Sequence, residues 1–233
     1  MKFLLFILTI CCLFIFSETT TFASPQSDNL TIKQQSIIPI SSYTATGDLT
    51  NLKIALNEGL NNGLTINETK EIMVHLYAYC GFPRALNGLS TLEQVLSERK
   101  DKGFIDTIGK DATPISDNVN MLELGTQTQT QLAGSPVHIN NSEAIDYTLK
   151  AHLFGYLFSR DILSYPEREI ATISALASMT GTESQLNSHY NIGVNAGLSD
   201  NQLQDIINVL NNKVDKKIAN NAQIKLNKFL NKK

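Results

Sequence analysis

The sequence predicts an all-α protein built from two tandem copies of one helical unit. Three observations lead to this prediction. Apolar residues recur at three- and four-residue spacing along most of the chain, capping boxes precede several of these stretches, and glycines end them. The same order of helix starts and stops returns after 134 positions, which is the spacing between Gly63 and Gly197.

The beginning of the chain is typical of an export signal. A lysine follows Met1, an apolar run covers residues 3–16, and small residues precede Ser24. Because this run is shorter than a membrane-spanning helix, we interpret residues 1–23 as a cleaved signal peptide, which predicts a periplasmic or secreted protein. A membrane anchor and a lipoprotein attached at Cys11 are weaker alternatives, the second because a bulky isoleucine precedes that cysteine.

Composition limits what the mature chain can be. Cys80 is its only cysteine, which excludes an internal disulfide framework. The remaining chain of about 210 residues is long enough to bury a core, as one large domain or two small ones. The whole sequence has a formal net charge of −3, and we interpret its lysine-rich end, residues 213–233, as a solvated helix face. We therefore expect no nucleic-acid partner, and no membrane attachment after cleavage.

The first unit is predicted over residues 34–103. Residues 48–63 carry apolar positions at helical spacing and end on a glycine. Thr65 and Glu68 then form a capping box for a second helix, and Pro83 begins a third.

Residues 104–141 separate the two units. They are rich in Thr, Gln and Gly and show little periodicity, so we expect an irregular linker. Because it is long for a passive connector, we expect it to wrap the other copy or to cover a site.

The second unit is predicted over residues 142–231. It opens with a helix over about residues 142–159. Three further helices follow, with starts at the polar residues Ser164, Thr182 and Ser199.

Matched residues indicate that the two units arose by duplication of a small helical domain. A repeat of short period would instead indicate a solenoid. A shift of 134 positions superposes Thr46 on Thr180, Gly47 on Gly181, Leu52 on Leu186, Asn57 on Asn191, Gly59 on Gly193, Asn61 on Asn195, Gly63 on Gly197, Leu64 on Leu198 and Ile72 on Ile206.

Two motifs carry a family resemblance. The first copy reads Ala-Leu-Asn-x-Gly-Leu-x-Asn-Gly-Leu-Thr from Ala55, then Tyr-x-Gly-Phe-Pro from Tyr79, and the second copy contains Arg168-Glu169 and Gln185-Leu-x-x-His189. Over residues 34–101 and 142–212 the chain resembles the carboxymuconolactone decarboxylase family. The resemblance implies all-α, alkylhydroperoxidase D-like units around a threefold axis, and therefore a homotrimer of duplicated chains or a hexamer.

The family includes two chemistries. Its decarboxylases act on a lactone acid by proton transfer, whereas its alkylhydroperoxidase D-like members use a Cys-x-x-Cys pair between a glutamate and a histidine. In this sequence the matching stretch, residues 180–185, contains no cysteine, while Glu169 matches the glutamate and His189 matches the histidine with a one-residue slip. The missing dithiol argues against reversible peroxidase chemistry of that type.

His189 and Glu169 are the first catalytic candidates. His189 aligns with Ala55 of the first copy and lies on the apolar side of its helix. An imidazole transfers protons near neutral pH, and a neighbouring carboxylate would orient it and raise its basicity. The structural alternatives are a core histidine bonded to a backbone carbonyl and a helix-terminal charge or ion pair with Arg168.

Three further candidates lie on the second helix of the first copy. His75 aligns with an apolar residue of the second copy and stands one turn from Tyr79; we place His75 among the catalytic residues and Tyr79 among those that bind substrate. Cys80 is a candidate thiol, but it lies about 140° around the helix from His75. Activation of that thiol would need another element, and a small buried residue is the alternative.

Two candidates for substrate binding lie on the helix that leads into the second copy. Arg160 would hold a substrate carboxylate with two hydrogen bonds, with His152 nearby. A salt bridge from Arg160 to Asp161 or to a glutamate is the structural alternative. No His-x-x-x-His or Glu-x-x-His spacing occurs, so no metal and no cofactor are expected.

The favoured hypothesis is a carboxymuconolactone decarboxylase-like enzyme of the lyase or isomerase type that acts on a small-molecule substrate. In this hypothesis His189 transfers a proton, Glu169 orients the imidazole, and His75 and Arg160 face the substrate. The first alternative is a peroxidase that uses Cys80 with a resolving thiol from another molecule. The second is a non-catalytic helical binding protein that kept the scaffold.

Overall fold

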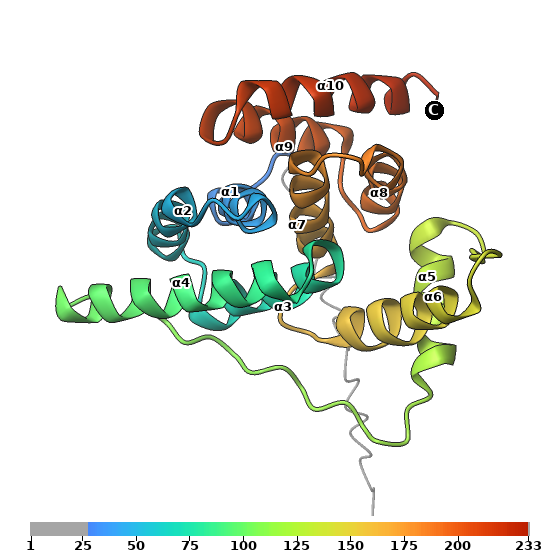
Figure 1. Ribbon diagram of the computed structural model, residues 1–233, viewed down its shortest axis with the longest axis horizontal. Helices are drawn as coiled ribbons and strands as arrows, with labels where there is room; N and C mark the ends of the chain where they lie inside the picture. Colours follow the sequence, from blue (N-terminus) through green and yellow to red (C-terminus); the bar gives the residue numbers. More distant parts are fainter. Residues whose placement is uncertain (1–27, 233) are drawn as a thin grey trace, which may run out of the picture.

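The computed structural model describes residues 28–232, which form helices joined by turns and loops and contain no strand (Figure 1). The all-α prediction is therefore confirmed. The predicted signal peptide lies outside the described residues. The helices are α1 (Ile32–Thr46), α2 (Leu49–Asn61), α3 (Ile66–Cys80), α4 (Phe82–Asp101), α5 (Met121–Ala133), α6 (Glu143–Thr148), the π-helix η1 (Leu149–Leu157), α7 (Tyr165–Ser178), α8 (Glu183–Asn195), α9 (Asp200–Lys213) and α10 (Lys216–Leu230).

Helices α1–α4 and α7–α10 follow the same plan. Both ends of α2 and α8 differ by 134 positions, as do the starts of α3 and α9 and those of α4 and α10. The packed pairs also correspond: α1 on α2 and α7 on α8, α2 on α4 and α8 on α10, α3 on α4 and α9 on α10. Across the two sets, α1 packs along α7, and the contacts of α3 with α7 and of α9 with α1 are reciprocal.

Glycines fix equivalent turns in the two sets. Gly63 and Gly197 adopt φ values of 94° and 109°, which residues with a side chain rarely adopt. Each ends a helix whose own glycine, Gly59 or Gly193, lies so close to the leucine after the turn that a Cβ would stand 3.0 or 3.2 Å from its Cδ1. The spacing that the sequence repeats is thus a requirement of close packing at both turns.

One large apolar core lies between the two sets. Its members come from α1–α4 and α7–α10, and α7 is its centre, with every residue from Arg168 to Leu176 buried. Burial of such a central helix means that any polar residue on it must find a partner inside the protein.

The segment 104–141, expected to be irregular, contains helix α5, so that prediction is wrong for residues 121–133. The buried residues of α5 recur at helical spacing, but they are mostly small or polar: Gly125, Thr128, Gln129 and Leu132. Hydrophobic periodicity therefore misses the helix. The signals that could have found it are the cap at Asn120, whose side chain accepts from the backbone of Glu123, and the left-handed Gly134 at its end.

The helix expected over residues 142–159 is present as α6 followed by the π-helix η1. It packs on α5 rather than among α7–α10, and Figure 1 shows these three elements as a group at one side of the molecule. The contact is close, because a Cβ on Gly125 of α5 would meet the Lys150 carbonyl oxygen at 1.7 Å. A second, smaller apolar cluster joins this group to α8 through Leu132, Phe154 and Ile192.

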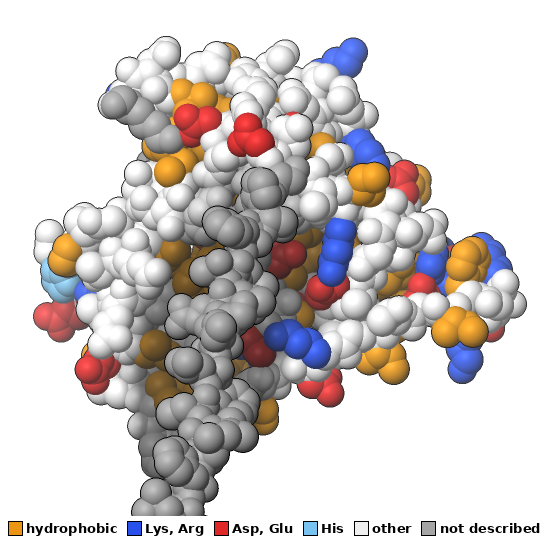
Figure 2. Space-filling view, turned by 180° about the vertical axis from the view of Figure 1, so that it is seen from behind, with side chains coloured by type: hydrophobic (Ala, Val, Ile, Leu, Met, Phe, Trp, Pro, Cys, Tyr) orange, Lys and Arg blue, Asp and Glu red, His pale blue; other side chains and the backbone are white. Residues whose placement is uncertain are grey.

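Within the described part of the chain, no helix combines the length and apolar character needed to cross a membrane. On the uncovered part of the face shown in Figure 2, lysines and arginines lie scattered among aspartates and glutamates.

Candidate functional site

His189 and Glu169 form a hydrogen-bonded pair inside one chain. Nδ1 of His189 on α8 lies 2.7 Å from Oε2 of Glu169 on α7. The Glu169 side chain is fully buried, and 11% of the His189 side chain is exposed. An antiparallel packing of α7 and α8 would have left the two residues at different heights, but the helices cross at a steep angle, which brings the side chains together (Figure 1).

Local sequence explains how each residue reaches this position. Glu169 lies in the second turn of α7, beside the buried Arg168 and Ile170, so its side chain points into the protein. His189 follows the buried Leu186 by three residues and precedes the buried Gly193 by four, which places it on the inner face of α8.

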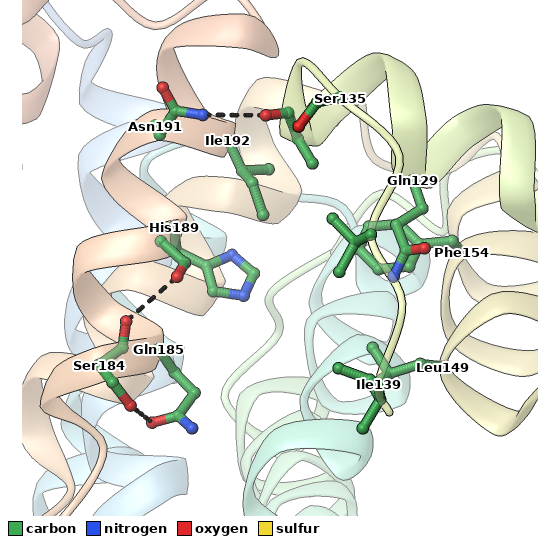
Figure 3. A pocket seen from close by; sticks show the side chains of 13 residues that line it. Gln129, Ser135, Ile139, Leu149, Phe154, Ser184, Gln185, His189, Asn191 and Ile192 are labelled. Carbon is green, nitrogen blue, oxygen red and sulfur yellow. Dashed lines mark hydrogen bonds between the residues drawn. The ribbon is translucent and has the colours of Figure 1, made fainter. Parts of the chain in front are cut away.

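The imidazole of His189 faces a cavity of about 550 Å³ between α8 and the group formed by α5 and η1 (Figure 3). Residues 133–139, which belong to the segment expected either to wrap the other copy or to cover a site, supply part of the wall of this cavity. The wall consists of Gln129, Ala133, Ser135, Val137, Ile139, Leu149, Phe154, Ser184, Gln185, Ser188, His189, Asn191 and Ile192.

The pair presents one reactive atom to this cavity. Glu169 is not part of the wall and accepts from Nδ1–H, which leaves Nε2 of His189 as the ring nitrogen available to a ligand. The other carboxylate oxygen of Glu169, Oε1, is buried without a hydrogen-bond partner among the described residues. A buried carboxylate with one strong partner holds the imidazole in a single orientation.

Tyr79 does not belong to the cavity wall, contrary to its predicted role in binding substrate. Its ring stands edge-on to His189, with the ring centroids 5.5 Å apart, and also contacts His75. Burial, followed by the nearby Glu169, raises the pKa of Tyr79, so its phenol stays protonated. Tyr79 therefore packs against the His189 ring from outside the cavity wall.

His75 lies apart from the cavity and is fully buried. Its Nε2 lies 2.8 Å from Oγ1 of Thr172, whose hydroxyl donates to the Arg168 carbonyl oxygen, so Nε2 must carry the hydrogen. Nδ1 then accepts from Arg168 over 3.3 Å. Burial, with Arg168 and His189, holds the pKa of His75 well below its usual range. The predicted catalytic residue is thus a neutral, structural histidine.

Arg160 forms an ion pair and does not contact the cavity. Its guanidinium donates to both oxygens of Glu71 on α3, at 2.8 to 3.1 Å, and Arg168 donates to the same carboxylate over 2.9 Å. The prediction that Arg160 binds substrate is therefore wrong for this cavity, and its structural alternative holds. Glu71 was not among the predicted residues. Its position one turn before His75, on the apolar face of the same helix, could have indicated a buried carboxylate that needs a partner.

Cys80 and His152 also lie away from His189. The half-buried thiol of Cys80 donates to the Leu76 carbonyl oxygen over 3.2 Å, and burial raises its pKa. His152 is hydrogen-bonded to the hydroxyl of Tyr77 and stacks on Tyr156. Neither residue faces the cavity.

Asn191 and Asn195 attach the covering helix to α8, and sequence analysis assigned them no such role. Their side-chain amides donate to the carbonyl oxygens of Ala133 and Leu132, at 3.2 and 2.8 Å. These carbonyls lie in the last turn of α5, where no intrahelical donor exists. The equivalent residues of the first copy, Asn57 and Asn61, instead accept from Arg99.

No protein-family model matches this chain, and no curated protein is significantly similar to it. Among residues 28–232, no cluster of three or more potential metal ligands occurs. The geometry around His189 is therefore the main guide to function.

Proposed function

We propose that this protein is a small-molecule enzyme of the lyase or isomerase type, with His189 as general acid and base and Glu169 as the residue that orients it. The observation that carries the proposal is the 2.7 Å hydrogen bond between them at the wall of a cavity. The cavity volume of about 550 Å³ suits a small organic ligand.

Relationship to the carboxymuconolactone decarboxylase family is part of this proposal. Three features support it: the motifs around Ala55 and Tyr79, the 134-residue correspondence of the helix bounds, and the positions of Glu169 and His189. We also propose that the mature chain is exported and forms a trimer or a hexamer. Light scattering of the purified protein tests the assembly; a monomer at micromolar concentration would contradict it.

In the proposed chemistry the proton moves through the His189–Glu169 pair, and solvent restores any proton that the reaction consumes. Nε2 of His189, acting as a base, removes a proton from a carbon next to a carbonyl group, and the electron pair of that C–H bond moves into an enolate. The imidazolium, held by the Glu169 carboxylate, then returns the proton to another carbon of the conjugated system. In the lyase variant, loss of carbon dioxide generates the enolate, and protonated His189 supplies the proton that completes the reaction.

The test uses two lactones. Carboxymuconolactone reports decarboxylation, and α-angelica lactone reports migration of its double bond into conjugation, which ultraviolet absorbance detects. We expect the wild type to accelerate at least one reaction and His189→Ala to lose roughly a hundredfold or more of that rate. Asn187→Ala, a change at an exposed position of the same helix outside the cavity wall, serves as the control and should keep the rate.

Equal rates for wild type and His189→Ala with both lactones would contradict an enzymatic role for this histidine. The alternative of a Cys80 peroxidase is less favoured, because burial raises the pKa of its thiol, and the thiol donates its hydrogen bond to the Leu76 carbonyl oxygen.

A further inference from the structure

We infer that the cavity takes an uncharged, largely apolar carbonyl compound, whose carbonyl oxygen accepts a hydrogen bond from the side-chain amide of Gln129. This inference rests on the isomerase form of the proposed function, because it assigns the substrate class of the same site and disfavours the decarboxylation of a carboxylate there. It follows from which groups the cavity wall contains and where they lie.

His189, when it is protonated, is the only residue of the cavity wall that carries a formal charge. None of its members is an aspartate, glutamate, lysine or arginine. Apolar side chains line both sides of the cavity: Ile192 lies on the α8 side with His189, and Phe154 and Leu149 lie on the side of Gln129 (Figure 3). The nearby cation Lys150 is not free, because its ammonium donates to Asp146 over 2.7 Å and does not belong to the wall.

A carboxylate substrate would therefore be unfavourable in this cavity. Transfer of an anion from water into a site without a cation costs several kcal/mol. Glu169, buried directly behind the imidazole, adds an unfavourable negative charge. A carboxylate that paired with protonated His189 would occupy Nε2, the atom that the proposed reaction needs. Arg160, the predicted ligand for a substrate carboxylate, is paired with Glu71, and so is the buried Arg168.

Gln129 supplies the complementary polar group. It lies on α5, across the cavity from His189 (Figure 3), and only 3% of the residue is exposed. Its side chain makes no hydrogen bond to the described residues, and its Oε1 atom is buried without a partner. Figure 3 shows the amide nitrogen of Gln129 on the side of the cavity, so a ligand carbonyl oxygen can accept from its N–H, while Oε1 stays on the far side without a partner.

The two groups together match a proton transfer next to a carbonyl. His189 takes the proton from one side, while the amide N–H of Gln129 donates to the oxygen on which negative charge develops. A neutral donor stabilises this oxygen more strongly beside apolar side chains such as Phe154 and Ile192 than in bulk water.

The test compares two probes with one carbon skeleton: neutral γ-nonalactone and its hydrolysed anion, 4-hydroxynonanoate. Binding to the wild-type protein is measured by calorimetry and by the NMR shifts of the cavity residues. We expect the lactone to bind at least roughly tenfold more tightly than the hydroxy acid. We expect Gln129→Leu to lower lactone affinity roughly tenfold, the value of one hydrogen bond in a dry site.

A measurement of the free energy of unfolding separates an effect of Gln129→Leu on binding from an effect on folding. Because the amide of Gln129 has no partner in the described chain, Gln129→Leu should leave the free energy of unfolding unchanged or raise it. Gln127→Leu, the same substitution at an exposed position of α5, is the matched control and should keep lactone affinity.

Each outcome is decisive. Equal or tighter binding of the hydroxy acid, no binding of either probe at millimolar concentration, or unchanged lactone affinity in Gln129→Leu would overturn the inference. Lactone binding that depends on Gln129, combined with lactone turnover that does not depend on His189, would support the inference about the cavity and refute the proposed catalytic role.

Discussion

Nδ1 of His189 donates to Oε2 of Glu169 over 2.7 Å, although the two residues lie on consecutive helices and are twenty positions apart. The steep crossing of α7 and α8 makes this contact possible within one chain (Figure 1). The carboxylate is fully buried, whereas the imidazole reaches the cavity. The pair thus separates an orienting group from a reactive one.

Replacing Glu169 with glutamine tests the orienting role. The amide keeps the size of the side chain but no longer requires Nδ1 of His189 to carry the hydrogen. We expect the rate to fall roughly a hundredfold or more. The ¹⁵N NMR signals of His189 should report a changed tautomer population. Glu183→Gln, at an exposed position on α8, is the control; an unchanged His189 spectrum in Glu169→Gln would refute the orienting role.

Glu71→Gln should destabilise the fold without touching the cavity. Glu71 is the acceptor for both Arg160 and the fully buried Arg168, so its loss leaves a buried cation without its counter-charge. We expect the free energy of unfolding to fall by about 3 kcal/mol in urea titrations. Glu58→Gln removes an exposed pair with Lys213 and should cost less than about 1 kcal/mol. Similar losses in both variants would contradict the role of this cluster.

His75 should make stability depend on pH. Because its pKa in the folded protein is well below that of an unfolded histidine, about 6.5, the folded state binds fewer protons in the range between the two values. Stability is therefore greatest above that upper value and falls as the pH decreases through this range, by at most about 1.4 kcal/mol per pH unit.

Urea titrations at several pH values measure this slope. We expect His75→Gln to reduce the dependence, while His138→Gln, at an exposed histidine, keeps the part that His75 contributes. A slope that stays the same in His75→Gln would show that His75 is not the group responsible.

The double variant Asn191→Ala, Asn195→Ala should loosen the cover of the cavity. Both amides donate to the last carbonyl groups of α5, so their loss removes two links between α5 and α8. We expect faster amide hydrogen exchange over residues 121–133, with little change in α7. The matched control, Asn57→Ala with Asn61→Ala, lies at the equivalent positions and should leave α5 protected. Equal exchange in α5 for both double variants would exclude this anchoring.

Cys80→Ser should leave the rate of a His189-dependent reaction within about twofold of wild type, because the thiol does not face the cavity. It should have no effect on hydroperoxide consumption, since burial raises the pKa of the thiol. A loss of either activity in Cys80→Ser would show that the thiol takes part in catalysis.

The sequence by itself determined the helical class and most helix boundaries. Capping boxes at Thr65 and Ser199, and glycines at 63 and 197, act within a few residues, so their effect is readable without knowledge of the fold. His189 stood out as a polar residue on an apolar helix face, opposite Ala55 in the repeat, but no local pattern showed that Glu169 would be its partner. Helix α5 escaped because its buried face is made of small and polar side chains.

Tertiary structure alone decided the partners of the buried polar groups. Glu71 pairs with Arg168, which lies 97 positions later in the chain, and also with Arg160. Arg168 in turn donates to His75. Arg160 and His75 therefore bond to this buried cluster and not to a ligand in the cavity. The same holds for Gln129, which faces His189 only because α5 folds over α8. The physical reason is that a buried charge or amide is defined by what surrounds it, and its surroundings come from chain segments that local sequence does not connect.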